Sequence, residues 1–276
     1  MKKILVPVDF SECSEHALKV ASDLAKKYDA EIIALHMMGM TDAVLTNMQT
    51  QQMLEGIYYV KLAQKRFKEF LDKDYLQGVS ITDAVYNYTD FSEINTVAEG
   101  NNVDLIVMGS HGSSGLTEVF VGSNTEKVVR HSEIPVLVVK NRHDNFEIKN
   151  GVFACDFTSE NLKVFKKAMK LYKSLNAKVT LLYINVPGQN YRSSKEMENR
   201  VRDFLFDADA VHLVDDVDYY SDYTVEDGIF NYSIKNTIDA IALPTHGRRG
   251  LAHFFSGSIS EDLVNHSDIP VITFKI

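Results

Sequence analysis

The sequence predicts an α/β protein with two tandem doubly wound domains, each a five-stranded, mainly parallel sheet with helices on both faces. The first observation is the length of 276 residues, which usually corresponds to about two domains. The second is a set of apolar runs without in–out alternation, as is typical of parallel strands covered on both faces. In the first half they are ILVPV (4–8), IIALHMM (32–38), LIVM (105–108) and PVLVVK (135–140). The third is an internal repeat.

Four segments of the first half return in the second half. The matched pairs are KKILVPVDFSE (2–12) with KNGVFACDFTSE (149–160), AEIIALHMM (30–38) with AKVTLLYIN (177–185), VDLIVMGSHG (103–112) with IDAIALPTHG (238–247), and EIPVLVVK (133–140) with DIPVITFK (268–275). A repeat of this length, with strands alternating with helical patterns, indicates two copies of one domain rather than a solenoid. The polar stretch NRHDNFEIKN (141–150) separates them. The predicted domains are therefore 1–141 and 149–276.

The helices of the first copy follow from apolar stripes and capping signals. The stripe of the first helix is Ala17, Ala21, Leu24, Ala25 and Tyr28, and that of the second is Met53, Ile57, Val60, Phe67 and Leu71. Ser11 is placed to cap the first helix. Asp90 with Glu93 three residues later forms a capping-box pattern, which predicts that the third helix starts at Asp90.

Composition and charge exclude several classes of function. The net charge is -9 with acids and bases interspersed, so no basic stripe is present to bind nucleic acid. The two cysteines, Cys13 and Cys155, indicate a reducing compartment rather than a disulfide framework. No run approaches the ~20 apolar residues of a membrane span, so we expect a soluble cytoplasmic protein. His and Cys spacings typical of a metal site are absent, and the acidic stretch 215–223 is expected at a solvated rim.

The stretch GSHGSSGLTEVFVGSN (109–124) holds four glycines between an apolar run and a helical pattern. In doubly wound sheets, ligands bind at the carboxyl ends of the strands where the strand order reverses. If that order is 3-2-1-4-5, Asp9 and Gly109 face each other across this crevice. A glycine loop and a helix N-terminus opposite a carboxylate favour a nucleotide, with its phosphates on the loop and its base toward the aspartate.

A purely structural role for the same residues is the alternative. Ser123 with Glu126, and Ser258 with Glu261, form capping-box patterns, so both serines have a helix-capping role without any ligand. On this reading Gly115 and Gly250 only shape the turn. Neither GxxxxGK[ST] nor a GxGxxG after the first strand occurs, which argues against a P-loop enzyme and an ordinary dinucleotide fold.

The motif resembles that of the universal stress protein family, whose ATP-binding members carry G-x-x-G, nine residues, and then G-[ST] after the fourth strand. Gly109 and Gly112, then residues 113–121, then Gly122 and Ser123 fit this pattern. The resemblance spans both copies and includes the Asp after the first strand and the Pro-Val at the start of the fifth. The chain therefore resembles a tandem universal stress protein.

The resemblance implies an adenine nucleotide site in the first copy, for ATP, or AMP or ADP, with Mg²⁺. The implied binding residues are Pro7, Val8, Asp9, Met37, Met108, Gly109, His111, Gly112, Gly122, Ser123 and Asn124. Asp9 and the backbone around Met37 would hold the adenine, while the glycines, Ser123 and Asn124 would bind the phosphates. His111 is expected to order the loop. No catalytic residue and no protein metal ligand is assigned.

The second copy departs from the pattern, because Pro244 replaces the first glycine and proline has no N–H. It is expected to bind weakly or not at all through Asp156, Ile184, Gly247, Arg248, Gly257, Ser258 and Ile259. The resemblance also implies that the fifth strands pair edge to edge, giving an intramolecular pseudo-dimer. Whether the chain forms further homo-oligomers or binds an unidentified protein partner stays open.

The resemblance implies an ATP-binding regulatory module of the stress response, with nucleotide held mainly by the first domain. One alternative is a nucleotide-independent interaction scaffold, whose melting ATP would leave unchanged. The other is a slow ATP-hydrolysing enzyme, which would need a general base near the γ-phosphate, whereas Asp9 is expected at the adenine end.

Overall fold

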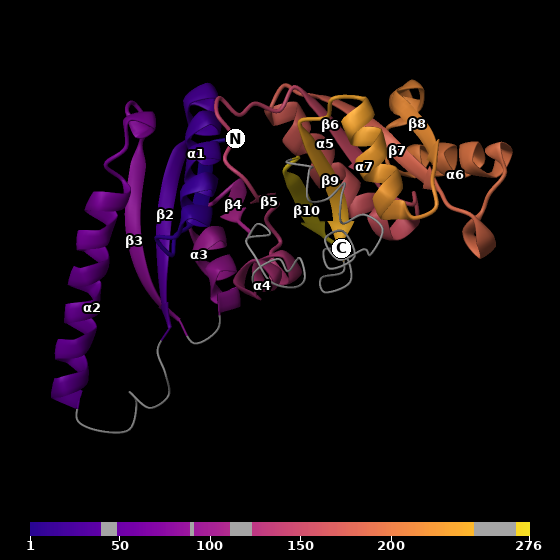
Figure 1. Cartoon of the computed structure of the whole chain (residues 1–276). Coiled ribbons are helices and arrows are strands. Elements are labelled where there is room, and N and C mark those ends of the chain that lie inside the picture. Colours follow the sequence, from indigo (N-terminus) through magenta and orange to yellow (C-terminus); the bar gives the residue numbers. More distant parts are fainter. Residues whose placement is uncertain (40–48, 89–90, 111–122, 246–268) are drawn as a thin grey trace.

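One mixed sheet of ten strands runs through the whole protein in the order β3-β2-β1-β4-β5-β10-β9-β6-β7-β8 (Figure 1). The computed structural model describes residues 1–39, 49–88, 91–110, 123–245 and 269–276. The strands are β1 (Lys3–Pro7), β2 (Glu31–Gly39), β3 (Ile81–Tyr88), β4 (Leu105–Gly109), β5 (Val136–Val139), β6 (Asn150–Ala154), β7 (Lys178–Asn185), β8 (Val217–Ser221), β9 (Ala240–Thr245) and β10 (Val271–Lys275). Each half, β1 to β5 and β6 to β10, therefore has the order 3-2-1-4-5, which confirms the predicted fold class.

The two halves meet where β5 pairs antiparallel with β10, while the other neighbouring strands pair parallel. Val138 lies opposite Val271, and Val136 lies opposite Thr273. The Thr273 hydroxyl also donates to the Val136 carbonyl at 3.3 Å. This pairing covers an edge of each half and confirms the predicted intramolecular pairing through the fifth strands.

Seven helices lie in the described part of the chain and cover the two faces of the sheet. They are α1 (Glu12–Tyr28), α2 (Gln49–Phe70), α3 (Ile94–Gly100), α4 (Ser123–His131), α5 (Leu162–Ser174), α6 (Ser194–Asp207) and α7 (Val225–Lys235). Residues of α1, α2, α5 and α6 join one continuous buried cluster that extends over both halves. On the opposite face, α3 and α4 cover the first half and α7 the second, in two separate clusters. Within the described residues, one buried cluster therefore spans both halves, and the other two clusters belong to one half each.

Local sequence signals determine where α1 begins and ends. Ser11 is its N-cap, and the side chain accepts a hydrogen bond from the Ser14 N–H, as predicted. Acidic residues occupy its first turn and basic residues its last turn, which suits the helix dipole. It ends at Asp29, whose φ of 51° is left-handed.

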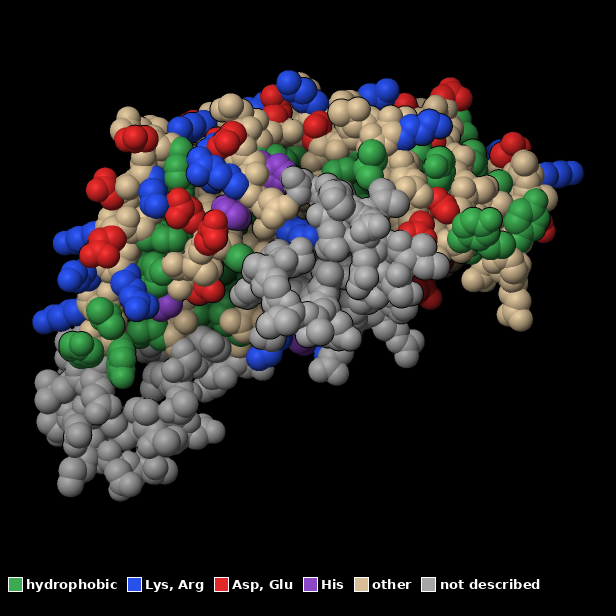
Figure 2. Space-filling view, viewed as in Figure 1, with side chains coloured by type: hydrophobic (Ala, Val, Ile, Leu, Met, Phe, Trp, Pro, Cys, Tyr) green, Lys and Arg blue, Asp and Glu red, His purple; other side chains and the backbone are tan. Residues whose placement is uncertain are grey.

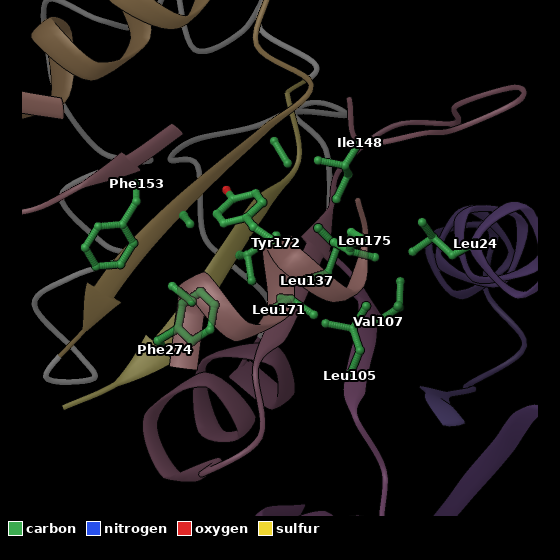
Figure 3. Packing of buried hydrophobic residues seen from close by; sticks show 14 of the residues in the cluster. Leu24, Leu105, Val107, Leu137, Ile148, Phe153, Leu171, Tyr172, Leu175 and Phe274 are labelled. Carbon is green, nitrogen blue, oxygen red and sulfur yellow. The ribbon is translucent and has the colours of Figure 1, made fainter. Parts of the chain in front are cut away.

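In the shared core, the two copies carry their large side chain on different elements. Tyr172 of α5 is 1% exposed, packs among the buried residues of Figure 3, and donates to the Val152 carbonyl at 3.1 Å. A Cβ on Gly151 would lie 2.2 Å from its ring. The corresponding pair in the first half is Ile4 of β1 and Ala25 of α1. The first half therefore has its large side chain on the strand, whereas the second half has it on the helix.

The structure tests two of the helix predictions in part. The third helix starts at Ile94 after a 3-10 turn over Phe91–Glu93, and Glu93, at its N-cap, makes no side-chain capping bond. The predicted start at Asp90 lies outside the described residues. On α2, Phe67 is buried as predicted, Leu71 follows the end of the helix, and the side chains of Met53 and Ile57 are not described.

Charged side chains of both signs alternate over the face seen in Figure 2, in both halves. The acidic stretch at 215–223 includes β8, an edge strand whose Asp218 is exposed, in keeping with the predicted rim. None of the helices that the structure describes has the length and apolar character needed to cross a membrane.

Ion pairs and hydrogen bonds tie the halves together around the seam. Glu133, just after α4, contacts Lys167 at 2.9 Å, Lys275 at 3.2 Å and Lys163 at 3.7 Å, all from the second half. Hydrogen bonds from Lys167, together with Lys275, lower the pKa of Glu133 to about 2 although burial opposes this. Tyr28 of α1 donates to the Leu175 carbonyl at 2.6 Å.

Candidate functional site

A cavity of about 150 Å³ opens at the carboxyl ends of β1 and β4, where the strand order of the first half reverses. Its lining residues come from β1 and the turn after it, from β2 and β4, from the 3-10 turn before α3, and from the N-termini of α1 and α4. They are Pro7, Val8, Asp9, Ser11, Cys13, Ser14, Leu35, Met37, Phe91, Met108, Gly109, Asn124 and Thr125. One wall is apolar, and the polar groups gather at the helix N-termini. The predicted crevice between Asp9 and Gly109 is therefore present.

The Asp9 carboxylate is held by a tight turn. Phe10, directly after it, has a φ of 65°, which is left-handed and strained for a bulky residue. The Ser11 N–H and hydroxyl both donate to Asp9 Oδ1, at 2.9 and 2.5 Å. Burial alone would raise the pKa of Asp9, but the hydrogen bonds from Ser11 and Ser14 outweigh it, so the net pKa lies below its usual value. Asp9 therefore stays ionised and accepts hydrogen bonds.

Aromatic packing behind the crevice holds this turn in place. The Phe10 ring lies 4.6 Å from His36 and 5.1 Å from Phe67, measured between ring centroids. His36 Nδ1 donates to the Val8 carbonyl at 2.6 Å. The buried face of Phe10 thus offsets the backbone strain, which is of the order of 1–3 kcal/mol for such a residue.

Gly109 has a packing role that the sequence did not reveal. A Cβ at this position would lie 2.2 Å from the Cys13 carbonyl oxygen, so the first turn of α1 can approach β4 only because residue 109 is glycine. On the other side, the Thr125 hydroxyl donates to the Gly109 carbonyl at 2.9 Å. Gly109 thereby joins the first turns of α1 and α4 at the crevice.

The structure places many of the predicted binding residues around this cavity. Those that line it are Pro7, Val8, Asp9, Met37, Met108, Gly109 and Asn124. His111, Gly112 and Gly122 lie outside the described residues, and Ser123 is the first residue of α4. The predicted N-cap serine is therefore the first helical residue, a one-residue difference, and its side chain is not described.

Sequence reasoning missed six lining residues: Ser11, Cys13, Ser14, Leu35, Phe91 and Thr125. Ser11 was assigned only a capping role, although it also fixes Asp9. Leu35 could have been found from the sequence, because it lies two residues before Met37 and so points to the same face of β2. Phe91, in the 3-10 turn before α3, also lines the cavity.

A second cavity, of about 190 Å³, lies at the corresponding place in the second half. It is lined by Ala154, Cys155, Asp156, Leu182, Ile184, Val225, Ile229, Leu243, Pro244, Thr245 and Thr273. Asp156 and Ile184 were predicted here. The other predicted residues of this site, Gly247, Arg248, Gly257, Ser258 and Ile259, lie outside the described residues.

The turn that presents Asp156 repeats the turn at Asp9. Phe157 has a φ of 52°, and Asp156 Oδ1 accepts hydrogen bonds from the Thr158 N–H and hydroxyl at 3.2 and 2.8 Å. The Asn161 side chain adds a third at 2.7 Å. Within the described part of the chain, no three His, Cys, Asp or Glu residues gather as metal ligands.

These features define a tandem α/β protein with one carboxylate-bearing crevice at the strand-order reversal of each half. The family model described as the universal stress protein family matches residues 1–140 and 147–275. The chain therefore belongs to the universal stress protein family, as a tandem member.

Curated relatives and solved structures agree with this. The chain is 33% identical over 139 residues to universal stress protein MJ0531 of Methanocaldococcus jannaschii, covering 50% of this chain and 82% of that protein. It is 35% identical over 151 residues to universal stress protein YxiE of Bacillus subtilis, covering 50% and 98%. A universal stress protein structure from Archaeoglobus fulgidus matches 99% of this chain and 96% of its own, with a TM-score of 0.61 and 19% identity. At 19% identity, the similarity to the Archaeoglobus fulgidus structure concerns the fold alone.

Proposed function

We propose that the protein is an ATP-binding regulatory module of the stress response and that the crevice of the first half holds the nucleotide. One observation carries the proposal. A single cavity is bordered by the Asp9 carboxylate, by apolar side chains of β2 and β4, and by the first turn of α4. These are the three environments that an amino-bearing base and an anionic phosphate chain require.

The base end is formed by Asp9, Met37 and Met108. Met37 and Met108 are 8% and 4% exposed, so they present an apolar surface that a flat ring can cover. Both hydrogen bonds from Ser11 reach Asp9 Oδ1, so Oδ2 faces neither Ser11 donor and can accept an N–H group. Adenine carries such an amino group.

The phosphate end is formed by the first turn of α4. The free backbone N–H groups and the dipole of a helix N-terminus favour an anion, and Asn124 and Thr125 of this turn line the cavity. The proposed phosphate ligands Gly112, Gly122 and Ser123 precede or begin this turn in the sequence. Mg²⁺ bound with the nucleotide would neutralise part of the phosphate charge.

Calorimetric titration with Mg-ATP tests the proposal on three chains: wild type, Asp9→Ala and the matched variant Asp156→Ala. We expect one ATP site per wild-type chain. Asp9→Ala should weaken it about 10-fold or more, since a hydrogen bond to a charged group contributes about 1.5–3 kcal/mol. Asp156→Ala, which changes the same turn in the other half, should leave ATP affinity within about twofold.

Two equal ATP sites per chain, or equal losses in both variants, would refute the assignment to the first half. The scaffold alternative predicts a different result in a melting experiment. ATP at 100 times its dissociation constant should add about 2.7 kcal/mol to the free energy of unfolding, and an unchanged melting temperature at millimolar ATP would favour a scaffold.

A further inference from the structure

We propose that copies of this chain associate head to tail, with the α2 end of one copy docked on the α6 end of the next. The α2 end consists of exposed residues of one helix: Tyr58, Tyr59, Lys61, Leu62, Lys65 and Lys68. The α6 end consists of exposed residues of α6 and of the 3-10 segment Val211–Asp216: Phe206, Asp207, Val211, Val214, Asp215 and Asp216. Neither end contributes a lining residue to the two described crevices, so the inference goes beyond the proposed function.

The two ends occupy equivalent places in the two copies of the repeat. The edge strands of the sheet are β3 and β8, which α2 and α6 precede in the chain. Figure 1 shows α2 and α6 at opposite ends of the molecule, while the edges of β5 and β10 are paired at the seam. A contact between unlike ends leaves one end of each kind available, so it repeats from copy to copy.

Both ends expose large apolar side chains. Tyr58 is 64% exposed, and its ring meets that of Tyr59 edge-on at 5.8 Å. Phe206 is 75% exposed, and the 3-10 segment that packs against α6 adds the exposed Val211 and Val214. Hydrophobic side chains are visible at both ends of the face in Figure 2. Exposed apolar groups of this kind mark contact surfaces, and they provide an apolar centre for a contact between the ends.

Charge determines which end docks on which. Residues 58–70 carry four basic residues and one acidic residue, whereas residues 203–227 carry nine acidic residues and neither Lys nor Arg. Lys61, Lys65 and Lys68 follow the spacing i, i+4, i+7, so they lie along one side of α2. The α2 end of one copy is therefore electrostatically complementary to the α6 end of another.

These charges are not neutralised within the described part of the chain. The exposed side chains that form no ion pair with any described residue are Lys61, Lys65 and Lys68 at one end and Asp207, Asp215 and Asp216 at the other. Each set of charges is thus available to a second copy.

The same charges disfavour the other arrangements of two copies. Two α2 ends would bring lysines together, and two α6 ends would bring aspartates together, which costs free energy. Direct pairing of β3 with β8 is disfavoured as well, because these edge strands expose Asp83 and Asp218. The proposed contact therefore joins side chains of the two ends and does not extend the sheet.

Sedimentation velocity of the full chain tests the inference over about 10–300 µM protein in about 50 mM NaCl. We expect the average mass of the wild type to rise with concentration beyond that of a dimer. Raising NaCl to about 500 mM should weaken association about 10-fold, because salt screens the contact between the ends.

Two multiple variants separate the ends. Lys61→Glu/Lys65→Glu/Lys68→Glu disables the α2 end, and Phe206→Asp/Val214→Asp disables the α6 end. Each variant alone should stay monomeric. An equimolar mixture should form a dimer and nothing larger, because the mixture keeps one intact end of each kind per pair of chains.

Lys166→Glu/Lys170→Glu/Lys173→Glu on α5 is the matched control. These lysines are exposed, have the same spacing as the three on α2 and give the same change in net charge, but they belong to neither end. The control should associate within about twofold of the wild type. Melting curves check that all variants are folded.

Four results would overturn the inference. They are a wild-type chain that stays monomeric at about 300 µM, a wild-type dimer that does not grow further, an equal loss of association in the α5 control, and a mixture of the two disabled variants that stays monomeric.

Discussion

A Cβ atom on Gly109 would lie 2.2 Å from the carbonyl oxygen of Cys13, so β4 and the first turn of α1 touch through their backbones. The second half has Pro244 at the equivalent place, and its helix α5 begins after a 3-10 turn, at the counterpart of Glu15 rather than of Glu12. The half with glycine at this position has the close approach, and the half with proline has the later helix start.

Gly109→Ala should destabilise the first half, because the new methyl group overlaps backbone rather than a flexible side chain. Such overpacking costs about 1–3 kcal/mol, which corresponds to a melting temperature lower by about 5 °C. Gly100→Ala is the matched control, since nothing lies within 4 Å of a Cβ there. Thermal melting of both variants measures the difference, and equal melting temperatures would contradict the packing role of Gly109.

Gly151 and Tyr172 should behave as a coupled pair. Gly151→Ala places a methyl group 2.2 Å from the ring of Tyr172, and Tyr172→Ala leaves a cavity in the shared core. The double variant approaches the arrangement of the first half, which has Ala25 on the helix. We expect it to be at least about 1 kcal/mol more stable than the sum of the single effects predicts. Urea unfolding of the four proteins measures this, and strict additivity would show that the two sites are independent.

The Glu133 network should make the stability of the seam depend on acid. The pKa of Glu133 is about 2 in the folded protein, below its ordinary value of 4.5, so its contribution is fully present above pH 4.5 and is lost as the pH falls toward 2. Because the side chain is 43% exposed, the effect is small. Glu133→Gln should lower the melting temperature by about 2 °C at pH 7.

The difference in melting temperature between wild type and Glu133→Gln should then shrink as the pH is lowered from about 4.5 to about 2. Melting curves across this range, at constant ionic strength, follow the change. A difference that stays constant with pH would mean that ionisation of Glu133 contributes nothing to the seam.

Much of the fold could be predicted from the sequence, because buried parallel strands and a long repeat leave strong patterns. The apolar runs became β1, β2, β4 and β5, and the family resemblance correctly implied that β5 and β10 pair. Ser11 was correctly placed as a cap, since capping depends on neighbouring residues alone. The predicted start of the third helix, Asp90, lies outside the described residues, and α3 begins at Ile94 after the 3-10 turn over Phe91–Glu93.

The site was predictable only in part, since several of its contacts join residues distant in the sequence. Asp9 and Gly109 could be paired across the crevice from an assumed strand order, which the structure confirms. The contact of Gly109 with Cys13 could not be predicted from the sequence, because it depends on how closely α1 approaches β4. Pro244 was identified as a departure from the motif, but the apolar cavity beside it became visible only when β7, β9 and α7 were placed together.

A crystal structure of the protein grown with saturating Mg-ATP tests the nucleotide assignment most directly. The predicted result is adenine against Met37 and Met108, with its amino group at Asp9 and its phosphates at the first turn of α4, and no triphosphate in the crevice of Asp156. A first crevice without nucleotide under these conditions, or a triphosphate bound only beside Pro244, would contradict it.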